Sequence, residues 1–302
     1  MQRHHKNSSS TSSLKLFSFE PRNNTRQEKN KQQPQLIIRC VRNRSHTPER
    51  RIITADCTIL LQTEEYSLTP DCLLRHNINE HMRAKMVDWM IEVTSIFQSL
   101  PRTFFIAVKI MDKFFTLQNV SVSSGLLHII GLTSIFIASK YEDVVTISSK
   151  EVVDLIAHNK ISSEDLFMTE QAILKKLGFF VNFITRCDFI EEISKEISLS
   201  EDLTRYALFL SQVSMHIYSH LSLKESQIAY CCLFISAKAL KKEESAIKIL
   251  AKCVISKVFV DFESFKADLI KFKTLNPKFQ KAQTTNKMDF GLVNGTFHAF
   301  IQ

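Results

Sequence analysis

The scarcity of glycine and proline constrains this chain most, since its 302 residues contain only five glycines and six prolines. Strand-rich folds need many tight turns, and turns draw heavily on these two residues. Long helices need few of them, so the composition predicts an all-α protein. The five glycines nowhere form a G-x-G-x-x-G or Walker A pattern, which disfavours the common nucleotide-binding folds.

Positive charge is concentrated near the start of the chain. Residues 1–50 hold 11 Lys and Arg against 3 Asp and Glu, whereas residues 51–302 hold 28 of each sign. The early segment is also rich in Ser, Asn and Gln, so it buries too little apolar surface to offset its chain entropy. We expect a disordered basic tail over residues 1–54. Because the rest is neutral, a nucleic-acid-binding fold is disfavoured, and nuclear import is one use for the tail.

The cysteines and the N-terminus indicate an intracellular protein. The seven cysteines form no C-x-x-C pair, and their scattered positions are typical of free thiols in a reducing compartment. No apolar segment follows the first basic residues, as a secretory signal would require. The longest apolar stretch, Leu126–Ala138, is shorter than the roughly 20 residues that cross a bilayer. We expect a protein of the nucleus and cytoplasm with no membrane contact.

Apolar residues recur at helical spacing from about residue 55 onward. After Asn79, a potential N-cap, Met82, Met86 and Val93 fall on one face of a helix. Further periodic segments follow, each bounded by capping residues or glycine. In the first half we expect helices near residues 80–97, 101–115, 124–142, 148–158 and 163–177.

The same order of helices recurs in the second half. The third helix of each half is apolar all round, and Ile135–Lys140 aligns with Leu233–Lys238 at an offset of 98 residues. The outer helices align poorly at this offset, so the repeat depends mainly on helix order. We predict two tandem all-α five-helix bundles, the first with an additional N-terminal helix in residues 55–181 and the second in residues 182–275, with a loosely packed C-terminal tail over residues 276–302. The second bundle has expected helices near residues 188–197, 201–218, 228–240, 244–254 and 261–272.

The sequence contains no recognisable motif for catalysis or for a metal ion. His216 and His220 have the spacing of a helical zinc pair, but the glutamate of H-E-x-x-H is missing and no third ligand is evident. No G-x-S-x-G elbow occurs, although a site built from residues distant in sequence stays one alternative. We therefore expect a protein that is not an enzyme and that needs no metal and no cofactor.

A short segment favours one protein family over the others. Met82-Arg83-Ala84-Lys85-Met86-Val87-Asp88-Trp89 places the only tryptophan beside an aspartate in an apolar helix. It closely resembles the opening of the cyclin box in A- and B-type cyclins. Ile110–Phe114, Ile137–Asp143 and Thr169–Phe179 resemble later strings of the family, in the expected order and on the expected helices. The resemblance covers about residues 55–275 and is weaker in the second half.

The resemblance implies two cyclin boxes and a regulatory subunit that activates a cyclin-dependent protein kinase in the cell cycle, at G2/M. Lys140 and Glu170 match two charged positions that contact the kinase, and Tyr141 and Phe179 are expected apolar contacts there. The implied mechanism is allosteric, because the bundle packs on the kinase's mobile C-helix and completes the kinase's own Lys–Glu pair. Taken alone, Lys140 is an ordinary solvated helix end.

Two further groups of residues follow from the resemblance. Arg83 and Asp112 match the family's internal ion pair between its first two helices. Lys85 stands where an aliphatic residue is usual in the patch that docks Arg-x-Leu motifs of substrates and inhibitors, and a cation there opposes an Arg-bearing ligand. Docking of such motifs therefore stays open. The residues that match this patch are Met82, Met86, Trp89 and Glu92.

The tail adds one candidate site, and two alternative functions stay open. Thr47-Pro48-Glu49-Arg50 fits the proline-directed pattern of such a kinase, so Thr47 is a candidate phosphosite. Residues 1–54 contain no R-x-x-L destruction box and no K-E-N box, so timed proteolysis would need another signal. The alternatives are a transcription-type member of the same fold, which pairs with a transcriptional kinase or acts as a basal factor on DNA, and a hydrolase with an unrecognised site.

Overall fold

Capping side chains set the starts of the helices in the computed structural model, which describes residues 73, 75–240 and 261–288. The Asn79 side chain accepts a hydrogen bond from the Met82 amide and begins the first described helix. Ser148 and Ser162 each form a capping box at the start of a later helix. In the described residues the regular structure is helical throughout, which confirms the predicted fold class.

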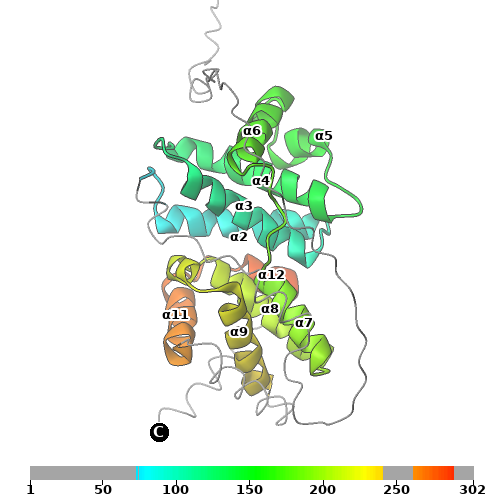
Figure 1. Cartoon of the computed structure of the whole chain (residues 1–302), viewed down its shortest axis with the longest axis vertical. Helices are drawn as coiled ribbons and strands as arrows, with labels where there is room; N and C mark the ends of the chain where they lie inside the picture. Colours follow the sequence, from blue (N-terminus) through cyan, green and yellow to red (C-terminus); the bar gives the residue numbers. More distant parts are fainter. Residues whose placement is uncertain (1–72, 74, 241–260, 289–302) are drawn as a thin grey trace, which may run out of the picture. The chain divides into compact units, whose positions relative to one another are not determined.

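The helices form two groups in chain order (Figure 1). The first group contains α2 (Glu80–Ile96), α3 (Pro101–Leu117), the 3₁₀ turn η2 (Ser124–Leu126), α4 (Leu127–Glu142), α5 (Ser149–Glu151), the π-helical turn η3 (Val152–Ile156) and α6 (Ser163–Lys176). The second group contains α7 (Arg186–Glu196), α8 (Glu201–Met215), the 3₁₀ turn η4 (Tyr218–Ser222), α9 (Glu225–Leu240) and α11 (Phe262–Leu275), and α12 (Lys281–Asn286) follows it. The helix expected near residues 244–254 and the tail over 1–54 lie outside the described residues.

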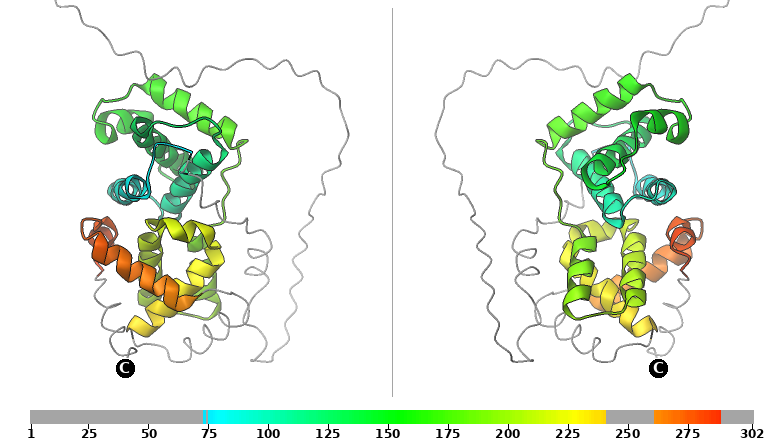
Figure 2. Two further views of the ribbon diagram at one scale, coloured as in Figure 1. Left: turned by 90° about the vertical axis from the view of Figure 1, so that its left-hand side faces the viewer. Right: turned by 90° about the vertical axis from the view of Figure 1, so that its right-hand side faces the viewer.

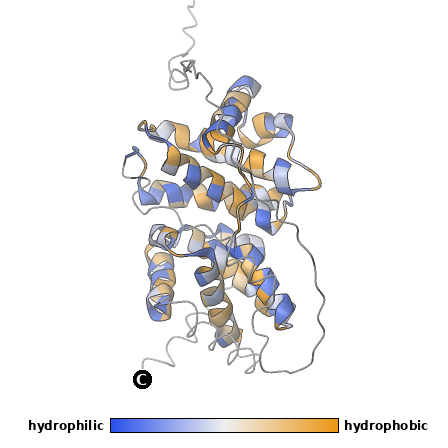
Figure 3. Ribbon diagram, viewed as in Figure 1, coloured by the Kyte–Doolittle hydropathy of each residue, from blue (hydrophilic) through white to orange (hydrophobic). Residues whose placement is uncertain are grey.

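The third helix of each group lies in the interior, as the apolar pattern predicted. α4 contacts α2, α3 and α6, and α9 contacts α7, α8 and α11. Leu132 and Ala138 in α4 and Leu233 and Ala237 in α9 are fully buried. The segment Ser124–Glu142 has the length and composition of a membrane span, but the core helix of a soluble protein passes the same test and most of this segment is buried. Figure 3 shows more hydrophilic residues along α11 than along α9.

The internal repeat is more regular in the structure than in the sequence. α4 and α9 match end to end at the offset of 98 residues, and α3 and α8 end at matching positions. α6 and α11 match at an offset of 99 residues. The outer helices therefore keep their positions in the repeat although their side chains do not align, because amphipathic helices tolerate exchange on both faces as long as the pattern is kept.

Residues 276–288 pack against neighbouring helices (Figure 2), unlike the loosely packed tail expected over residues 276–302. α12 packs against α2 and α8, and Phe279 and Ala282 are buried. The Phe279 ring stacks on Phe272 of α11 at a centroid distance of 5.8 Å. Polar composition concealed this packing, because two apolar side chains are enough to anchor a helix of six residues.

The buried carboxylate of Glu225 connects the two groups of helices. Arg186 of α7 donates to Glu225 of α9 through its amide and its guanidinium, at 2.9 and 2.8 Å, and Lys109 of α3 lies 3.2 Å from the same carboxylate. Burial alone would raise the pKa of Glu225, but Arg186 and Lys109 outweigh it and lower this pKa to about 2. The carboxylate therefore stays charged between the two groups.

Candidate functional site

The two charges that the sequence assigns to a partner surface lie together. Lys140, in the last turn of α4, forms an ion pair with Glu170 of α6. The ammonium also lies 4.1 Å from the centroid of the Phe136 ring, one turn earlier in α4. The Lys140 side chain is 40% exposed and the Glu170 side chain 13%. Both charges are therefore held in position at the surface of the first group.

Large apolar side chains are exposed on the two helices that carry this ion pair and on the segments next to them in the chain. They come from the end of α4, the loop after it, η3, α6 and the segment that follows α6. Val144 is the most exposed, at 95%, although the interior of a protein is the usual place for valine. An exposed apolar patch of this kind is typical of an interaction surface. We call this set the apolar face, and it consists of Tyr141, Val144, Val145, Leu155, Phe167, Met168, Phe179 and Phe180.

Phe179 has an unusual backbone. Its φ angle is +62°, as is that of the preceding Gly178, and a bulky residue rarely adopts this left-handed conformation. The Phe179 amide donates to the Leu174 carbonyl at 2.8 Å, which closes a Schellman motif at the end of α6. The motif thus holds the Phe179 ring outward, where it is 68% exposed.

Four of the sequence-predicted residues belong to this site, and several others were missed. The structure brings Lys140 and Glu170 into contact and leaves Tyr141 and Phe179 exposed on adjoining elements. Among the missed residues, only Val144 and Val145 could have been recognised from the sequence, because they are adjacent aliphatic residues directly after a helix end. Phe167 and Met168 fall on the outer side of α6, which periodicity alone does not separate from its core side.

Arg83 and Asp112 form a buried ion pair. The Arg83 guanidinium donates from Nε to Asp112 Oδ1 at 2.8 Å and from Nη2 to Oδ2 at 2.6 Å, and both side chains are 1% exposed. Its third nitrogen, Nη1, donates to the Met215 carbonyl at the end of α8, at 2.8 Å. This pair therefore joins α2 to α3 and also joins the first group of helices to the second.

The structure corrects the expected docking patch. Met86 is 6% exposed and faces Gly131 of α4, where its methyl group occupies the place that a Cβ would take. It is therefore a core residue with little surface left for a peptide. Met82 and Trp89 are half-buried, and the Trp89 ring lies 4.7 Å from the ring of His128. Burial, with a smaller contribution from Lys160, lowers the pKa of His128.

The remaining patch residue, Glu92, is bound within the chain. Its carboxylate lies 2.5 Å from the ammonium of Lys281 in α12, and the Lys281 amide donates to Asp88 at 3.2 Å. Lys85 is exposed. The candidate patch thus has an apolar centre formed by Met82 and Trp89. Lys85 follows Met82 in α2, and Lys281 pairs with the Glu92 carboxylate.

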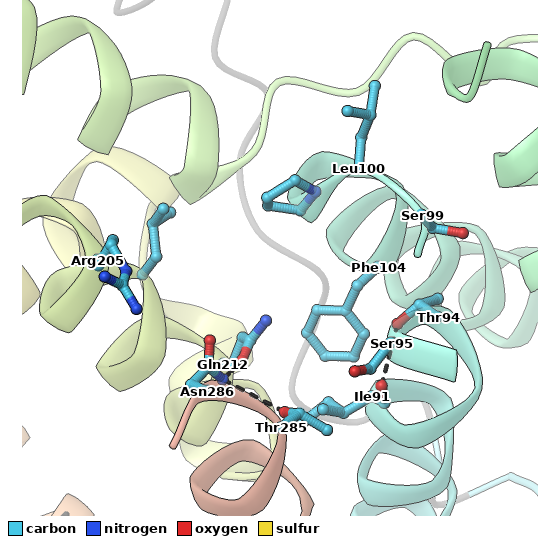
Figure 4. A pocket seen from close by; sticks show the side chains of 12 residues that line it. Ile91, Thr94, Ser95, Ser99, Leu100, Phe104, Arg205, Gln212, Thr285 and Asn286 are labelled. Carbon is cyan, nitrogen blue, oxygen red and sulfur yellow. Dashed lines mark hydrogen bonds between the residues drawn. The ribbon is translucent and has the colours of Figure 1, made fainter. Parts of the chain in front are cut away.

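A pocket lies where α12 meets the two groups of helices (Figure 4). Ile91, Phe104 and Leu208 provide its apolar lining. Figure 4 shows Arg205 on one side and Asn286 beside Gln212, to whose side-chain oxygen Asn286 donates at 2.7 Å. α12 therefore forms one wall of this pocket.

The histidines of the candidate zinc pair have other contacts. His216 stacks on Phe279 at a centroid distance of 5.9 Å and lies 3.3 Å from Asp88, and His220 stacks on Phe265 at 4.5 Å. In the part of the chain that the structure describes, no group of three or more His, Cys, Asp or Glu side chains is placed to hold a metal ion. Thr47, the candidate phosphosite, lies outside the described residues.

Comparison with known proteins identifies the family. The family model described as the cyclin N-terminal domain matches residues 55–182, the segment that carries the buried ion pair and the apolar face. Residues 55–182 belong to the cyclin family. Its relatives include the G2/mitotic-specific cyclin-B2 of Rana japonica, which is 34% identical over 165 residues, or 54% of this chain and 41% of that protein.

A longer alignment covers more of this cyclin. The G2/mitotic-specific cyclin-B2 of Macaca fascicularis is 27% identical over 237 residues, which is 74% of this chain and 59% of that protein. The chain spans about half the length of the curated relatives it matches. Among solved structures, that of the yeast RNA Pol II CTD kinase CTDK-1 complex covers 72% of this cyclin and 75% of that chain, with a TM-score of 0.55 and 11% identity. This last similarity shows the fold alone.

Proposed function

We propose that this cyclin is a regulatory subunit that binds and allosterically activates a cyclin-dependent protein kinase in the control of cell division at G2/M. The observation that carries the proposal is the apolar face around the Lys140–Glu170 ion pair. The four residues that family resemblance assigns to kinase contact all lie there. Mitotic relatives at about a third identity support the same cell-cycle role.

The apolar face is itself held rigidly. Its side chains project from α4, α6 and the short segments attached to them, whose inner sides are fixed in the core by residues such as Phe136, Leu166 and Ile173. Burying exposed valine and phenylalanine on association releases roughly 1.5–3 kcal/mol for each side chain that becomes fully covered. A few such residues are enough to favour one conformation of a partner, because a minor state lies only a few kcal/mol above the ground state.

The proposed mechanism requires no chemistry from the cyclin. The apolar face packs on the kinase's mobile C-helix and stabilises its inward position, in which the kinase's own Lys–Glu pair is complete and its activation loop is released. Lys140 and Glu170 fix the register of the two surfaces through charge and hydrogen bonds. Every catalytic group then belongs to the kinase.

Pull-down from extract with the full chain as bait, followed by a kinase assay on the captured complex, tests this function. We expect a cyclin-dependent kinase to co-purify and to phosphorylate a model substrate only when the cyclin is present. Capture of a transcriptional kinase instead would favour the transcription-type alternative. Turnover of substrate by the cyclin alone, or inactivity of every cyclin-dependent kinase in its presence, contradicts the proposal.

A double variant tests the interface separately from the fold. We expect Lys140→Ala with Glu170→Ala to abolish co-purification while the helical circular dichroism is retained, because an exposed ion pair contributes at most about 1 kcal/mol to stability. The matched control is Lys195→Ala with Glu192→Ala, which removes an exposed pair in α7. Co-purification of the test variant at wild-type strength rejects the interface.

A further inference from the structure

Arg102, in the first turn of α3, holds three separate segments with one side chain. Its Nε donates to Asp188 Oδ1 at 2.6 Å, its Nη1 to Glu142 Oε2 at 2.5 Å and its Nη2 to the Phe183 carbonyl at 3.0 Å. Glu142 is the last residue of α4, Asp188 lies in the first turn of α7, and Phe183 lies in the connection between α6 and α7. The side chain is 22% exposed.

Two of these segments carry the apolar face. The last turn of α4 contains Lys140 and Tyr141, immediately before the anchored Glu142. The connection between α6 and α7 contains Phe179 and Phe180, and the Phe180 ring packs edge-on against that of the anchored Phe183 at a centroid distance of 5.8 Å. The Arg102 guanidinium therefore fixes the distance between the two parts of the face.

Other contacts of α3 strengthen the same anchor on α4. Asp143, which follows Glu142, accepts hydrogen bonds from the Leu100 amide at 2.9 Å and from the Thr103 hydroxyl at 2.5 Å. The start of α3 thus fixes the end of α4 through two consecutive carboxylates. Arg102 extends this anchor to the connection after α6 and to α7.

The chemistry of the three acceptors requires arginine. A guanidinium is planar and presents five donors in a fixed fork, so it serves two carboxylates and a carbonyl in different directions, which a lysine ammonium cannot do in one geometry. Burial opposes the charge, but Asp188 and Glu142 outweigh it, so the pKa of Arg102 is raised. The guanidinium therefore keeps its charge.

We propose that Arg102 is a positioning residue for kinase binding, which holds the end of α4 and the connection after α6 in the relative arrangement that the kinase requires. The inference rests on the proposed kinase-binding function. Arg102 is outside the buried cores of the two groups and is not itself part of the apolar face. Its loss leaves both cores intact and frees the two parts of the face to move independently.

Kinase affinity and amide hydrogen exchange of the full chain test this role. We expect Arg102→Ala to weaken kinase affinity at least tenfold and Arg102→Lys to weaken it by an intermediate factor. In the free cyclin, Arg102→Ala should speed exchange in residues 139–143 and 178–183 and not in the core of α4. Binding of the kinase should slow exchange in these two segments again.

A matched control separates positioning from general stabilisation. Lys273 of α11 is another partly buried cation with two acceptors, the Phe279 carbonyl at 2.7 Å and Gln283 Oε1 at 2.5 Å, and both lie far along the chain from the apolar face. We expect Lys273→Ala to leave kinase affinity within twofold of wild type.

A double-mutant cycle of Arg102→Ala with Glu142→Ala should show strong non-additivity in kinase affinity.

The possible results distinguish failure of the positioning role of Arg102 from failure of the proposed kinase-binding function. Wild-type affinity in Arg102→Ala, or faster exchange spread over every helix together with a proportional loss of affinity, overturns the positioning role. Failure of the wild-type chain to bind any kinase overturns the proposed function, and the positioning role with it. Both proposals are supported if the wild type binds the kinase tightly and Arg102→Ala loses affinity, with faster amide exchange confined to residues 139–143 and 178–183. The kinase affinity of Lys273→Ala must then be unchanged.

Discussion

Lys140 and Lys238 occupy equivalent positions 98 residues apart, and each ammonium lies over the phenylalanine ring one turn earlier in its helix. The distance from Nζ to the ring centroid is 4.1 Å for Lys140 over Phe136 and 4.4 Å for Lys238 over Phe234. The internal repeat therefore extends to single side chains at the ends of α4 and α9.

The two lysines differ in what covers them. Lys140 is exposed beside Glu170, whereas Lys238 also lies 5.6 Å from the centroid of Phe262 in α11, and burial lowers its pKa. Phe262, the first residue of α11, packs edge-on against Phe234 at 4.8 Å, whereas the ring of α6 nearest Phe136 in the first group, that of Phe167, is 6.4 Å away. The same helix end is thus covered in the second group and open in the first, where the apolar face lies.

Substitution of Asp112 tests the role of the buried ion pair. In Asp112→Ala, the Arg83 guanidinium stays buried without the carboxylate, so we expect a loss of about 3–5 kcal/mol in the free energy of unfolding, measured with urea. Replacing both partners, in Arg83→Met with Asp112→Leu, should recover most of the loss, because no charge then stays buried. A loss below about 1 kcal/mol in Asp112→Ala would contradict this account.

Phe179→Gly separates backbone strain from partner binding. Glycine adopts positive φ freely, and the exposed ring contributes little to the core, so we expect the free energy of unfolding to be unchanged or to rise by up to about 1 kcal/mol. Kinase co-purification should weaken, because an aromatic side chain is removed from the apolar face. The control is Ile96→Ala, since Ile96 is equally exposed, at 68%, and is not part of the face. A less stable variant that binds normally would refute both expectations.

His220 makes stability depend on pH between about 6 and 4. Burial, together with repulsion from Arg186, lowers the pKa of His220 from 6.5 to about 3, and the nearby Asp268 carboxylate, at 3.5 Å and 37% exposed, is too solvated to reverse this. Below pH 6.5 the unfolded chain binds a proton that the folded protein does not, so stability falls as pH falls, by roughly 1.4 kcal/mol per pH unit.

Urea unfolding at a series of pH values measures this slope. His220→Phe keeps an aromatic ring against Phe265 and removes the titrating group, so its slope between pH 6 and 4 should be smaller by the same amount. Glu225, whose pKa is lowered to about 2, adds stability that is lost as pH falls below about 4.5, so it steepens only the lower end of this window and does so in the variant and the wild type alike. Equal slopes in the variant and the wild type would exclude His220 as the cause.

Lys85 is expected to weaken the binding of Arg-bearing peptides to the candidate docking patch. Its ammonium repels the arginine of an Arg-x-Leu motif, so we expect Lys85→Leu to tighten the binding of such a peptide by up to about fivefold, which corresponds to about 1 kcal/mol for an exposed charge. Fluorescence anisotropy at low and high salt measures this change, which salt should reduce. A peptide that binds neither the variant nor the wild type would show that the patch does not dock this motif.

The sequence determined the order of the described helices from α2 to α11 and the two that lie in the interior. Few glycines and prolines excluded a strand-rich fold, and the wholly apolar patterns of α4 and α9 required that other helices surround them. The cyclin family followed from a string of residues around Trp89. These features are local or periodic, so they can be recognised along the chain.

Only the tertiary structure decided which residues share a site. Met86 belongs to the core because α4 passes over it at Gly131, and residues 276–288 are packed because Phe279 and Ala282 find a surface on neighbouring helices. Arg102 joins three segments that lie 40 to 86 residues away in the chain. Contacts of this kind depend on the relative placement of packed helices, which no periodic pattern contains, because the same amphipathic helix can present its polar side chains to solvent or to another helix.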